Sequence, residues 1–290
     1  MRRRRPGGTS RRIIAHEEQE KLSIHLPVLL SQEGAEYEVV VVDMNSEDDT
    51  LDLLKSLEGQ HPHLKHLSLP PTARDISRER LALHLGMRAA VYGRVLVLNA
   101  GMEIPSPHWL ADIESRWRAD CDIMLIPTMR TRSKKLGDCL TAGHEAWRNR
   151  LYQKQALANR LFRSGSAIVG LNKEIFLTHN SPAKHLALKT GTLDIFVSHA
   201  ASRYNTILLE EEELYPTEDN IKFSRLWRQK RLFDVETRQH LKSCFRRHLT
   251  YIAYCFATIH KGAIAYSMLD IYDYLRWVLT RKKTFTKKHY

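Results

Sequence analysis

Four consecutive valines at 39–42 are the feature that most restricts how this chain can fold. The run 38–43 shows no alternation of polar and apolar residues, which is typical of a parallel strand buried on both faces. A second buried run follows at 94–98, and apolar residues recur with helical spacing between the two runs. The expected strands are 12–15, 38–43, 64–69 and 94–98, and the expected helices are 18–30, 50–57 and 77–91. This alternation predicts an α/β fold with a doubly wound sheet, whose ligands bind beyond the carboxyl ends of its strands.

The length and charge of the chain restrict its class. It has 290 residues, of which 43% are hydrophobic, enough for one large domain or for one domain with an appendage. The formal net charge of +12 suits an anionic partner, but many of the basic residues lie in the terminal segments 2–12 and 281–288. Solvated arms and a nucleic-acid interface both fit such tails. No nucleic-acid-binding motif accompanies them, so we expect no nucleic acid among the partners.

Signals for location are few. The arginines at 2–12 precede only two apolar residues, Ile13 and Ile14, so no secretory signal is predicted. The four cysteines form no Cys-x-x-Cys pair, which fits a reducing cytoplasm rather than a zinc site or a disulfide framework. The aromatic and basic stretch 249–279 carries too many charges for a membrane span. We expect amphipathic helices there, which either contact the anionic inner face of a membrane or pack on the domain.

Several further segments occur in a characteristic order. They are 39–50, 76–83, 96–105 with Trp109 and Leu110, 164–170, 191–196 and 227–231. Together these segments resemble the inverting family 2 glycosyltransferases, particularly the Bacteroides-type members. The resemblance implies a GT-A type, Rossmann-like mixed sheet with C-terminal helices. It divides the chain into a basic arm at 1–11, a glycosyltransferase-like domain at 12–245, and amphipathic helices with a basic tail at 246–290. Within the domain, 12–110 would form the nucleotide-binding half and 111–245 the acceptor half.

The resemblance implies that Asp43 binds the base or ribose of a nucleotide-sugar donor. A carboxylate at a strand end can accept hydrogen bonds from an imide N–H or from ribose hydroxyls. The alternative for Asp43 is a role in a turn or a helix cap. Met44 stands where the family often has a second acidic residue. Arg78, near the start of the third helix, would face the diphosphate of the donor, or else lies on the surface of that helix.

The family's Asp-x-Asp pair corresponds to Asn99-Ala100-Gly101 in this sequence. In the family that pair holds Mn²⁺ or Mg²⁺, which neutralises the diphosphate leaving group. Asn99 offers one neutral oxygen and is assigned to the nucleotide-binding residues, whereas Gly101 has no side chain. Glu103 would replace the pair only if the loop turned it inward. A divalent cation is therefore expected for the family, but its ligands are missing here and no metal-binding residue is assigned.

Asp194 is the candidate catalytic residue. The resemblance implies a general base in the segment 191–196, which takes the proton from the acceptor hydroxyl as that oxygen attacks the sugar. Asp194 is the carboxylate that this segment retains, one position later than the usual base of the family. The alternative is an aspartate that the helix dipole favours at a helix N-terminus.

The segment 227–231 supplies the remaining candidates. It resembles the family element beside the diphosphate and the acceptor, and it assigns Gln229, Lys230 and Arg231 to that role. Arg228 adds a further positive charge, and such charges can stabilise a leaving diphosphate where a metal does not. The alternative is a basic amphipathic helix with Trp227 buried.

Other motifs indicate no different chemistry. His61, His63 and His66 lie in a polar connector without matching carboxylates, so no metal site is expected there. The sequence has neither the glycine fingerprint of dinucleotide-binding folds nor a P-loop. The segment 164–166 lacks the flanking pattern of a nucleophile elbow and is expected to line the acceptor site.

The sequence thus predicts an inverting glycosyltransferase that moves a hexose-like unit from a nucleotide sugar to a cell-envelope glycan or a lipid-linked acceptor. The competing hypothesis is a catalytically inactive relative that binds a nucleotide, a glycan or a partner enzyme through the same scaffold. Under both hypotheses the expected location is the cytoplasm, with peripheral contact to the inner membrane as an option.

Overall fold

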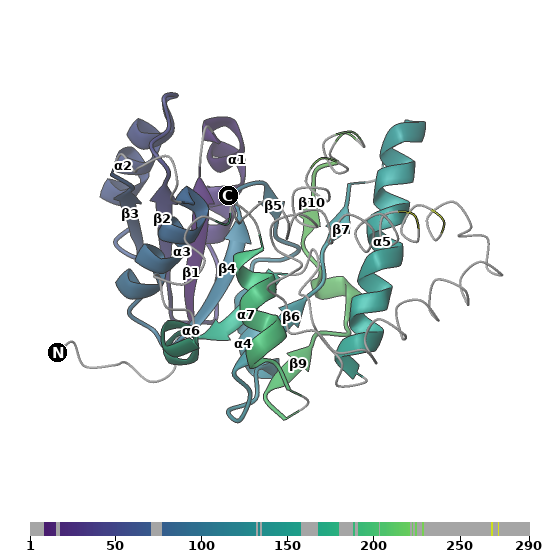
Figure 1. Cartoon of the computed structure of the whole chain (residues 1–290). Coiled ribbons are helices and arrows are strands. Elements are labelled where there is room, and N and C mark those ends of the chain that lie inside the picture. The colour runs from purple at the N-terminus through teal and green to yellow at the C-terminus, as the bar shows by residue number, and fades with distance from the viewer. Residues whose placement is uncertain are drawn as a thin grey trace, which may run out of the picture.

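The computed structural model describes residues 9–15, 18–70, 77–131, 133, 135–157, 168–179, 188, 191–202 and 204–220, together with 222, 224, 228, 268 and 272. These residues form an α/β domain with helices on both faces of a central sheet and a smaller sheet beside it (Figure 1). The candidates at 164–166 and at Gln229, Lys230 and Arg231 lie outside this part of the chain, as does nearly all of 246–290. What the sequence predicts for them stays a prediction.

The first half of the chain follows the predicted alternation. Its elements are β1 (Thr9–Ala15), α1 (Gln19–Leu30), β2 (Tyr37–Asp43), α2 (Thr50–Gln60), β3 (Leu64–Ser68), α3 (Arg78–Ala89) and β4 (Arg94–Asn99). The main correction concerns β1, which was expected at 12–15 and begins at Thr9. The backbone of β1 pairs with β2 and with β4 from Thr9 onward. Pairing on both sides fixes this strand although its first residues are polar.

The second half of the chain is less regular. Its elements are β5 (Met102–Glu103), α4 (Trp109–Arg116), β6 (Ile123–Ile126), β7 (Met129–Arg130), α5 (Leu136–Leu157), β8 (Ile168–Asn172), α6 (Lys173–His179), α7 (Thr192–Ala200), β9 (Thr206–Leu208), the 3-10 helix η1 (Glu212–Leu214) and β10 (Thr217–Glu218). Several of these strands have only two residues, so tertiary contacts rather than local preference must hold them in place.

The described residues form a main sheet of seven strands in the order β3-β2-β1-β4-β8-β6-β9. The pairs β1–β2, β1–β4, β2–β3 and β6–β9 are parallel, whereas β8 runs against both of its neighbours, β4 and β6. The mixed, doubly wound sheet predicted from the sequence is confirmed. Strand order reverses between β1 and β4, because β2 and β3 extend the sheet on one side and the later strands extend it on the other. Folds of this kind bind ligands at that reversal.

Apolar layers hold the helices against both faces of the main sheet. On one face, α1 and α4 pack with β2, β4 and β6, and Trp109 of α4 is completely buried there. On the other face, α3, α6 and α7 pack with β4, β6 and β8 around Phe176 and Phe196. The inner face predicted for α1 is confirmed, since the residues that form it are all buried: Leu22, Leu26, Leu29 and Leu30.

The smaller sheet has the order β5-β10-β7. Strand β5 follows β4 closely in the chain, and β7 follows β6. Strand β10 pairs antiparallel with β5 and parallel with β7. The smaller sheet therefore continues from the carboxyl ends of β4 and β6, which is where the ligand of such a fold would bind. Among the described helices, none has the length and apolarity that crossing a membrane requires.

Gly170 in β8 leaves no room for a side chain. A Cβ atom at this position would lie 2.6 Å from Cη2 of Trp117 and 2.9 Å from Cδ2 of Leu96. We expect the substitution Gly170→Ala to lower the free energy of unfolding by about 1–3 kcal/mol, because overpacking displaces core neighbours. Urea denaturation measures the change.

Gly59 in α2 provides the matched control. No atom lies within 4 Å of a Cβ added there. Gly59→Ala should raise the free energy of unfolding by up to about 1 kcal/mol, because alanine favours the helix more than glycine does. An unchanged midpoint for Gly170→Ala would contradict the packing of Trp117 against β8.

Candidate functional site

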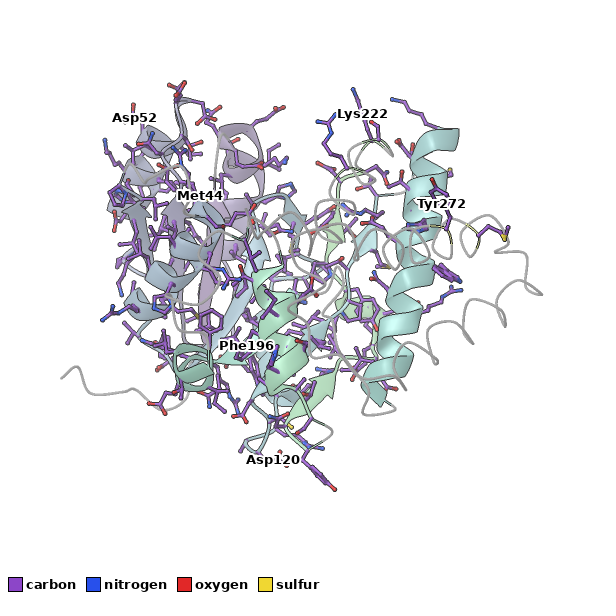
Figure 2. The ribbon with its side chains drawn as sticks, in the orientation of Figure 1. Met44, Asp52, Asp120, Phe196, Lys222 and Tyr272 are labelled. Atoms are coloured by element: carbon purple, nitrogen blue, oxygen red, sulfur yellow. The ribbon has the colours of Figure 1, made fainter. Side chains whose placement is uncertain are left out.

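The candidate site lies at the carboxyl edge of the main sheet. Strand β2 ends there at Asp43 and β4 ends there at Asn99, because both strands are parallel to β1 between them. Figure 2 shows Asp52 near the upper end of the molecule, Met44 below it in the same half, and Asp120 at the lower end. Met44 and Asp52 follow β2, whereas Asp120 precedes β6, so the two ends are the carboxyl edge and the amino edge.

Asp43 stabilises the turn that follows β2. It is only 2% exposed, and its Oδ1 accepts hydrogen bonds from the backbone N–H of Ser46 at 3.1 Å and from the Ser46 hydroxyl at 2.5 Å. Asn45, within this turn, has a φ of 64°. Asparagine tolerates this left-handed conformation better than most residues with a side chain. The geometry is that of the turn role that the sequence left open, and a contact from Asp43 to a base or ribose stays a prediction.

Asp48 connects the loop after β2 to the start of α1. Its Oδ2 accepts a hydrogen bond from the backbone N–H of Gln19 at 3.3 Å, and its Oδ1 accepts one from the N–H of Thr50 at 3.1 Å. Hydrogen bonding with Thr50 is the main cause that lowers the pKa of the Asp48 carboxyl. A carboxylate is favoured beside helix N-termini, so one side chain fixes α1 relative to α2 at this edge.

Asn99 joins the end of β4 to a network of buried charges. Its Nδ2 donates a hydrogen bond to Oε1 of Glu218 in β10 at 2.9 Å. The other oxygen of Glu218, Oε2, lies 3.0 Å from Nη1 of Arg130 in β7. Arg130 also donates to both carboxylate oxygens of Glu145 in α5, at 2.5 and 3.0 Å. We call these four residues the Arg130 network.

Burial dominates the electrostatics of the Arg130 network. The charged side chains of Arg130, Glu145 and Glu218 are only 11–13% exposed. Burial raises the pKa of the Glu218 carboxyl, and the charges of Arg130 and Lys21 act against this rise. Burial also disfavours the charge of Arg130, but its contacts with Glu145 and Glu218 outweigh this effect and raise the pKa of its guanidinium.

Lys21 of α1 covers the loop after β4. A Cβ atom added to Gly101 would lie 2.8 Å from Cδ and 3.5 Å from Cε of Lys21. The ammonium group of Lys21 lies 2.7 Å from Oε2 of Glu18, and these two side chains are 44% and 27% exposed. The lysine therefore occupies the space into which a side chain at position 101 would project.

These residues do not fit the divalent cation that the resemblance implies. Asn99 directs its amide nitrogen to Glu218, both oxygens of Glu218 already have partners, and Lys21 fills the space beside Gly101. Among the residues that the structure describes, no group of three or more His, Cys, Asp or Glu side chains could hold a metal ion.

Glu103 does not replace the missing acidic pair. It is exposed in β5 and lies opposite Thr217, whereas Glu218 lies opposite Met102. Cross-strand partners share a face and successive residues of a strand alternate between faces. Glu103 and Glu218 therefore point to opposite faces of the smaller sheet.

One expectation about the histidines was wrong. Nδ1 of His66 contacts Oε2 of Glu58 in α2, although the connector was expected to lack a matching carboxylate. Nε2 of His63 lies 3.1 Å from the carbonyl oxygen of Leu30. The second of these contacts ties the start of β3 to the end of α1, which is a structural role.

Asp194 lies in the first turn of α7 and is 7% exposed. Strands β4, β6 and β9 point the same way, because β8 runs against β4 and β6 while β9 is parallel to β6. Helix α7 ends shortly before β9 begins, so its last turn lies toward the amino edge. Its nine residues span about 13 Å. The first turn, with Asp194, therefore lies toward the same carboxyl edge as Asp43 and Asn99.

Arg78 is exposed in the first turn of α3. Helix α3 follows β3, and Ser77 caps it by accepting a hydrogen bond from the N–H of Arg80 at 3.3 Å. This turn belongs to the carboxyl edge as well, since β3 is parallel to β2. A contact from Arg78 to a diphosphate stays a prediction.

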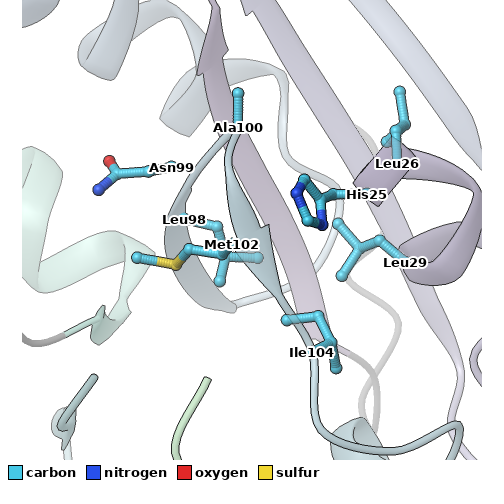
Figure 3. Close-up of a pocket in the computed structure, with 8 residues that line it drawn as sticks. All are labelled: His25, Leu26, Leu29, Leu98, Asn99, Ala100, Met102 and Ile104. Carbon is cyan, nitrogen blue, oxygen red and sulfur yellow. The ribbon is translucent and has the colours of Figure 1, made fainter. Parts of the chain in front are cut away.

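A small apolar pocket lies between α1 and the segment β4–β5 (Figure 3). The lining residues are His25, Leu26, Leu29, Leu98, Asn99, Ala100, Met102 and Ile104. The space within it, open solvent included, is about 230 Å³. In Figure 3 the amide of Asn99 points away from His25, so the polar part of this residue faces the Arg130 network and not the pocket.

No family model and no curated protein matches the sequence. Solved structures do share its fold. The mannosyltransferase PcManGT from Pyrobaculum calidifontis, in complex with GDP-Man and Mn²⁺, has a TM-score of 0.60 at 14% identity, covering 97% of this chain and 83% of that one. S. aureus TarS 1–349 in complex with UDP has a TM-score of 0.54 at 15% identity, covering 88% and 72%. Glucosyl-3-phosphoglycerate synthase from Mycobacterium tuberculosis has a TM-score of 0.51 at 14% identity, covering 78% and 77%.

The fold is that of the GT-A glycosyltransferases. Within this GT-A fold, Asp43, Asn99 and Asp194 lie toward one edge of the sheet, and the roles that the sequence assigns to them stay predictions. Four residues beside the loop after β4 or in the Arg130 network were not predicted from the sequence: Lys21, Arg130, Glu145 and Glu218. Asn99 and Glu218 are 119 positions apart in the chain, and two-residue strands carry no periodic signal that would have joined them.

The Arg130 network predicts a pH-dependent loss of stability in the substitution Arg130→Met. At pH 8 the free energy of unfolding should fall by about 3–5 kcal/mol, because Glu218 and Glu145 remain buried without a positive partner. Losing Arg130 raises the pKa of Glu218 further above its unfolded value. Such a group stabilises the folded state when protonated, and this contribution disappears as the pH rises through the folded pKa. The loss should therefore be smaller at pH 5, which urea denaturation at the two pH values tests.

Arg118→Met is the control for this experiment. Arg118 pairs with Asp120 on the surface, where the two side chains are 60% and 68% exposed. Its removal should cost about 0–1 kcal/mol, since exposed ion pairs contribute little. An equal loss at both pH values in Arg130→Met would show that Glu218 does not depend on Arg130.

Proposed function

We propose that this chain transfers a sugar, with inversion, from a nucleotide-sugar donor to a hydroxyl of a glycan or a lipid-linked acceptor. The observation that carries the proposal is the GT-A fold with Lys21, Asn99 and Glu218 gathered beside the reversal of strand order. Ligands of doubly wound folds bind at that place. Solved structures with this fold hold UDP, UDP-GlcNAc or GDP-Man.

In the proposed reaction Asp194 takes the proton from the acceptor hydroxyl. The hydroxyl oxygen attacks C1 of the sugar, and the bond from C1 to the nucleoside diphosphate breaks in the same step, which inverts the configuration. Placement of Asp194 toward the carboxyl edge supports this role. Asp43 and Arg78 are proposed for the nucleotide, and Gln229, Lys230 and Arg231 for the acceptor or the diphosphate.

Nucleotide binding is the first test of this proposal. The melting temperature is measured with UDP, GDP, UDP-GlcNAc, GDP-Man and CMP-linked sugars, each with manganese and with EDTA. A ligand at about 100 times its dissociation constant adds roughly 2.7 kcal/mol, which moves the midpoint by several degrees. A shift with one nucleotide names the donor for a transfer assay. Unchanged midpoints with every nucleotide would contradict the proposal.

The substitution Asp194→Asn tests the general base. With the donor named, sugar transfer should fall at least about 100-fold, because the amide cannot take a proton. Nucleotide binding and the melting temperature should stay within error of the unsubstituted chain. Asp52→Asn is the matched control, since Asp52 also lies in the first turn of a helix and is exposed. If the two variants transfer sugar equally well, Asp194 is not the general base and serves only to stabilise the N-terminus of α7.

A catalytically inactive relative is the second candidate, and the absence of carboxylates at Asn99 and Gly101 favours it. The double substitution Asn99→Asp with Gly101→Asp tests whether this loop is equivalent to the metal loop of the family. In the variant, the new carboxylate at position 99 would face Glu218 across a contact that is now 2.9 Å, and the new side chain at position 101 would displace Lys21. Two carboxylates this close repel each other until a cation joins them.

We expect the double variant to gain manganese-dependent thermal stabilisation, with and without nucleotide. Manganese titrated into the single variant Asn99→Asp separates the contribution of each new carboxylate. A double variant that is as insensitive to manganese as the original chain would show that this loop is not equivalent to the metal loop of the family.

A further inference from the structure

We propose that Lys21 contacts the diphosphate of the donor, and that the site binds a nucleoside diphosphate without a divalent cation. This inference rests on the proposed function and deepens it. It concerns a residue that sequence reasoning did not single out, and it follows from the place of α1 beside the end of β4.

The position of Lys21 is set by the topology of the sheet. Helix α1 begins directly after β1, and β1 is hydrogen-bonded to β4 at the reversal of strand order. Lys21, in the first turn of α1, therefore lies over the loop that leaves β4. Its alkyl chain fills the space beside Gly101, where Cδ is 2.8 Å from an added Cβ. The alkyl chain of a positively charged residue thus occupies the place from which an acidic side chain at 101 would hold a cation.

The charge of Lys21 is available to a ligand. Its ammonium pairs with Glu18 at 2.7 Å, in a contact between partly exposed side chains three positions apart. Exposed pairs of this kind contribute little to stability, so a phosphate oxygen can replace Glu18 at small cost. A phosphate also accepts charge-assisted hydrogen bonds, which are stronger than bonds between neutral groups.

The surroundings of Lys21 oppose a divalent cation at the same point. Glu218 is the carboxylate that such a cation would need beside Asn99, but Arg130 already pairs with it and Asn99 donates to it. Lys21 is the second positive group at this point, with its alkyl chain beside Gly101. A dication would have to displace one of these positive groups or approach it closely, and like charges repel strongly in a partly buried site.

Binding of UDP and GDP to the full chain tests the inference by isothermal titration calorimetry, once in EDTA and once in MnCl₂. For the nucleotide that binds, we expect dissociation constants within about twofold in the two buffers. Lys21→Met keeps the apolar chain over Gly101 and removes the charge, so binding in EDTA should weaken by about tenfold or more. Lys21→Arg keeps the charge and should stay within about threefold of the original affinity.

Lys55→Met is the matched control. Lys55 also forms an exposed pair with an acidic residue three positions earlier, Asp52, but it lies on α2 away from Gly101. The affinity of this variant for the nucleotide should not change. Binding that requires manganese and is unaffected by Lys21→Met would overturn the inference and leave the donor function standing. Failure of both nucleotides to bind in both buffers would overturn the inference, and unchanged midpoints with the CMP-linked sugars as well would overturn the donor function.

Discussion

The contact of Arg130 with Glu218 on one side and Glu145 on the other is the interaction on which the rest of the site depends. Strands β5, β7 and β10 have two residues each, too few for a sheet to be stable alone. Arg130 ties β7 to β10 and to α5, and Glu218 ties β10 to the end of β4. This buried charge network thus adds polar contacts between the smaller sheet, α5 and the end of β4.

The same network decides which ligands the edge can accept. Arg130 pairs with both carboxylates, and removing one member of such a buried network costs more than the network as a whole contributes. Glu218 is therefore committed to the structure and is a poor metal ligand. The positive charges near Asn99 come from the protein itself, through Arg130 and Lys21. On the proposal made for Lys21, its charge would face the diphosphate of the donor.

Much of the fold could be predicted from the sequence, because long buried elements carry a periodic signal. The valines 39–42 predicted β2, and the spacing of the leucines predicted the buried face of α1. The start of β1 could not be predicted, since pairing on both sides overrides its polar residues. At the site, the position of Asp43 could be predicted but its partner could not. The contacts of Asn99 and Gly101 could not be predicted, because their partners lie in β10 and in α1, and neither segment carries a motif.

The position of β8 between β4 and β6 sets the spacing of the loops at the carboxyl edge. Strand β8 separates β4 from β6, and adjacent strands are about 4.8 Å apart, so the ends of β4 and β6 stand roughly 10 Å from each other. Beyond the main sheet, β10 separates β5 from β7 in the same way. The distance from β5 to β7 in the smaller sheet is therefore two strand spacings, the same as the distance from β4 to β6 in the main sheet. Substitutions can change the chemistry of the two loops, but the distance between them is set by hydrogen-bonded backbone.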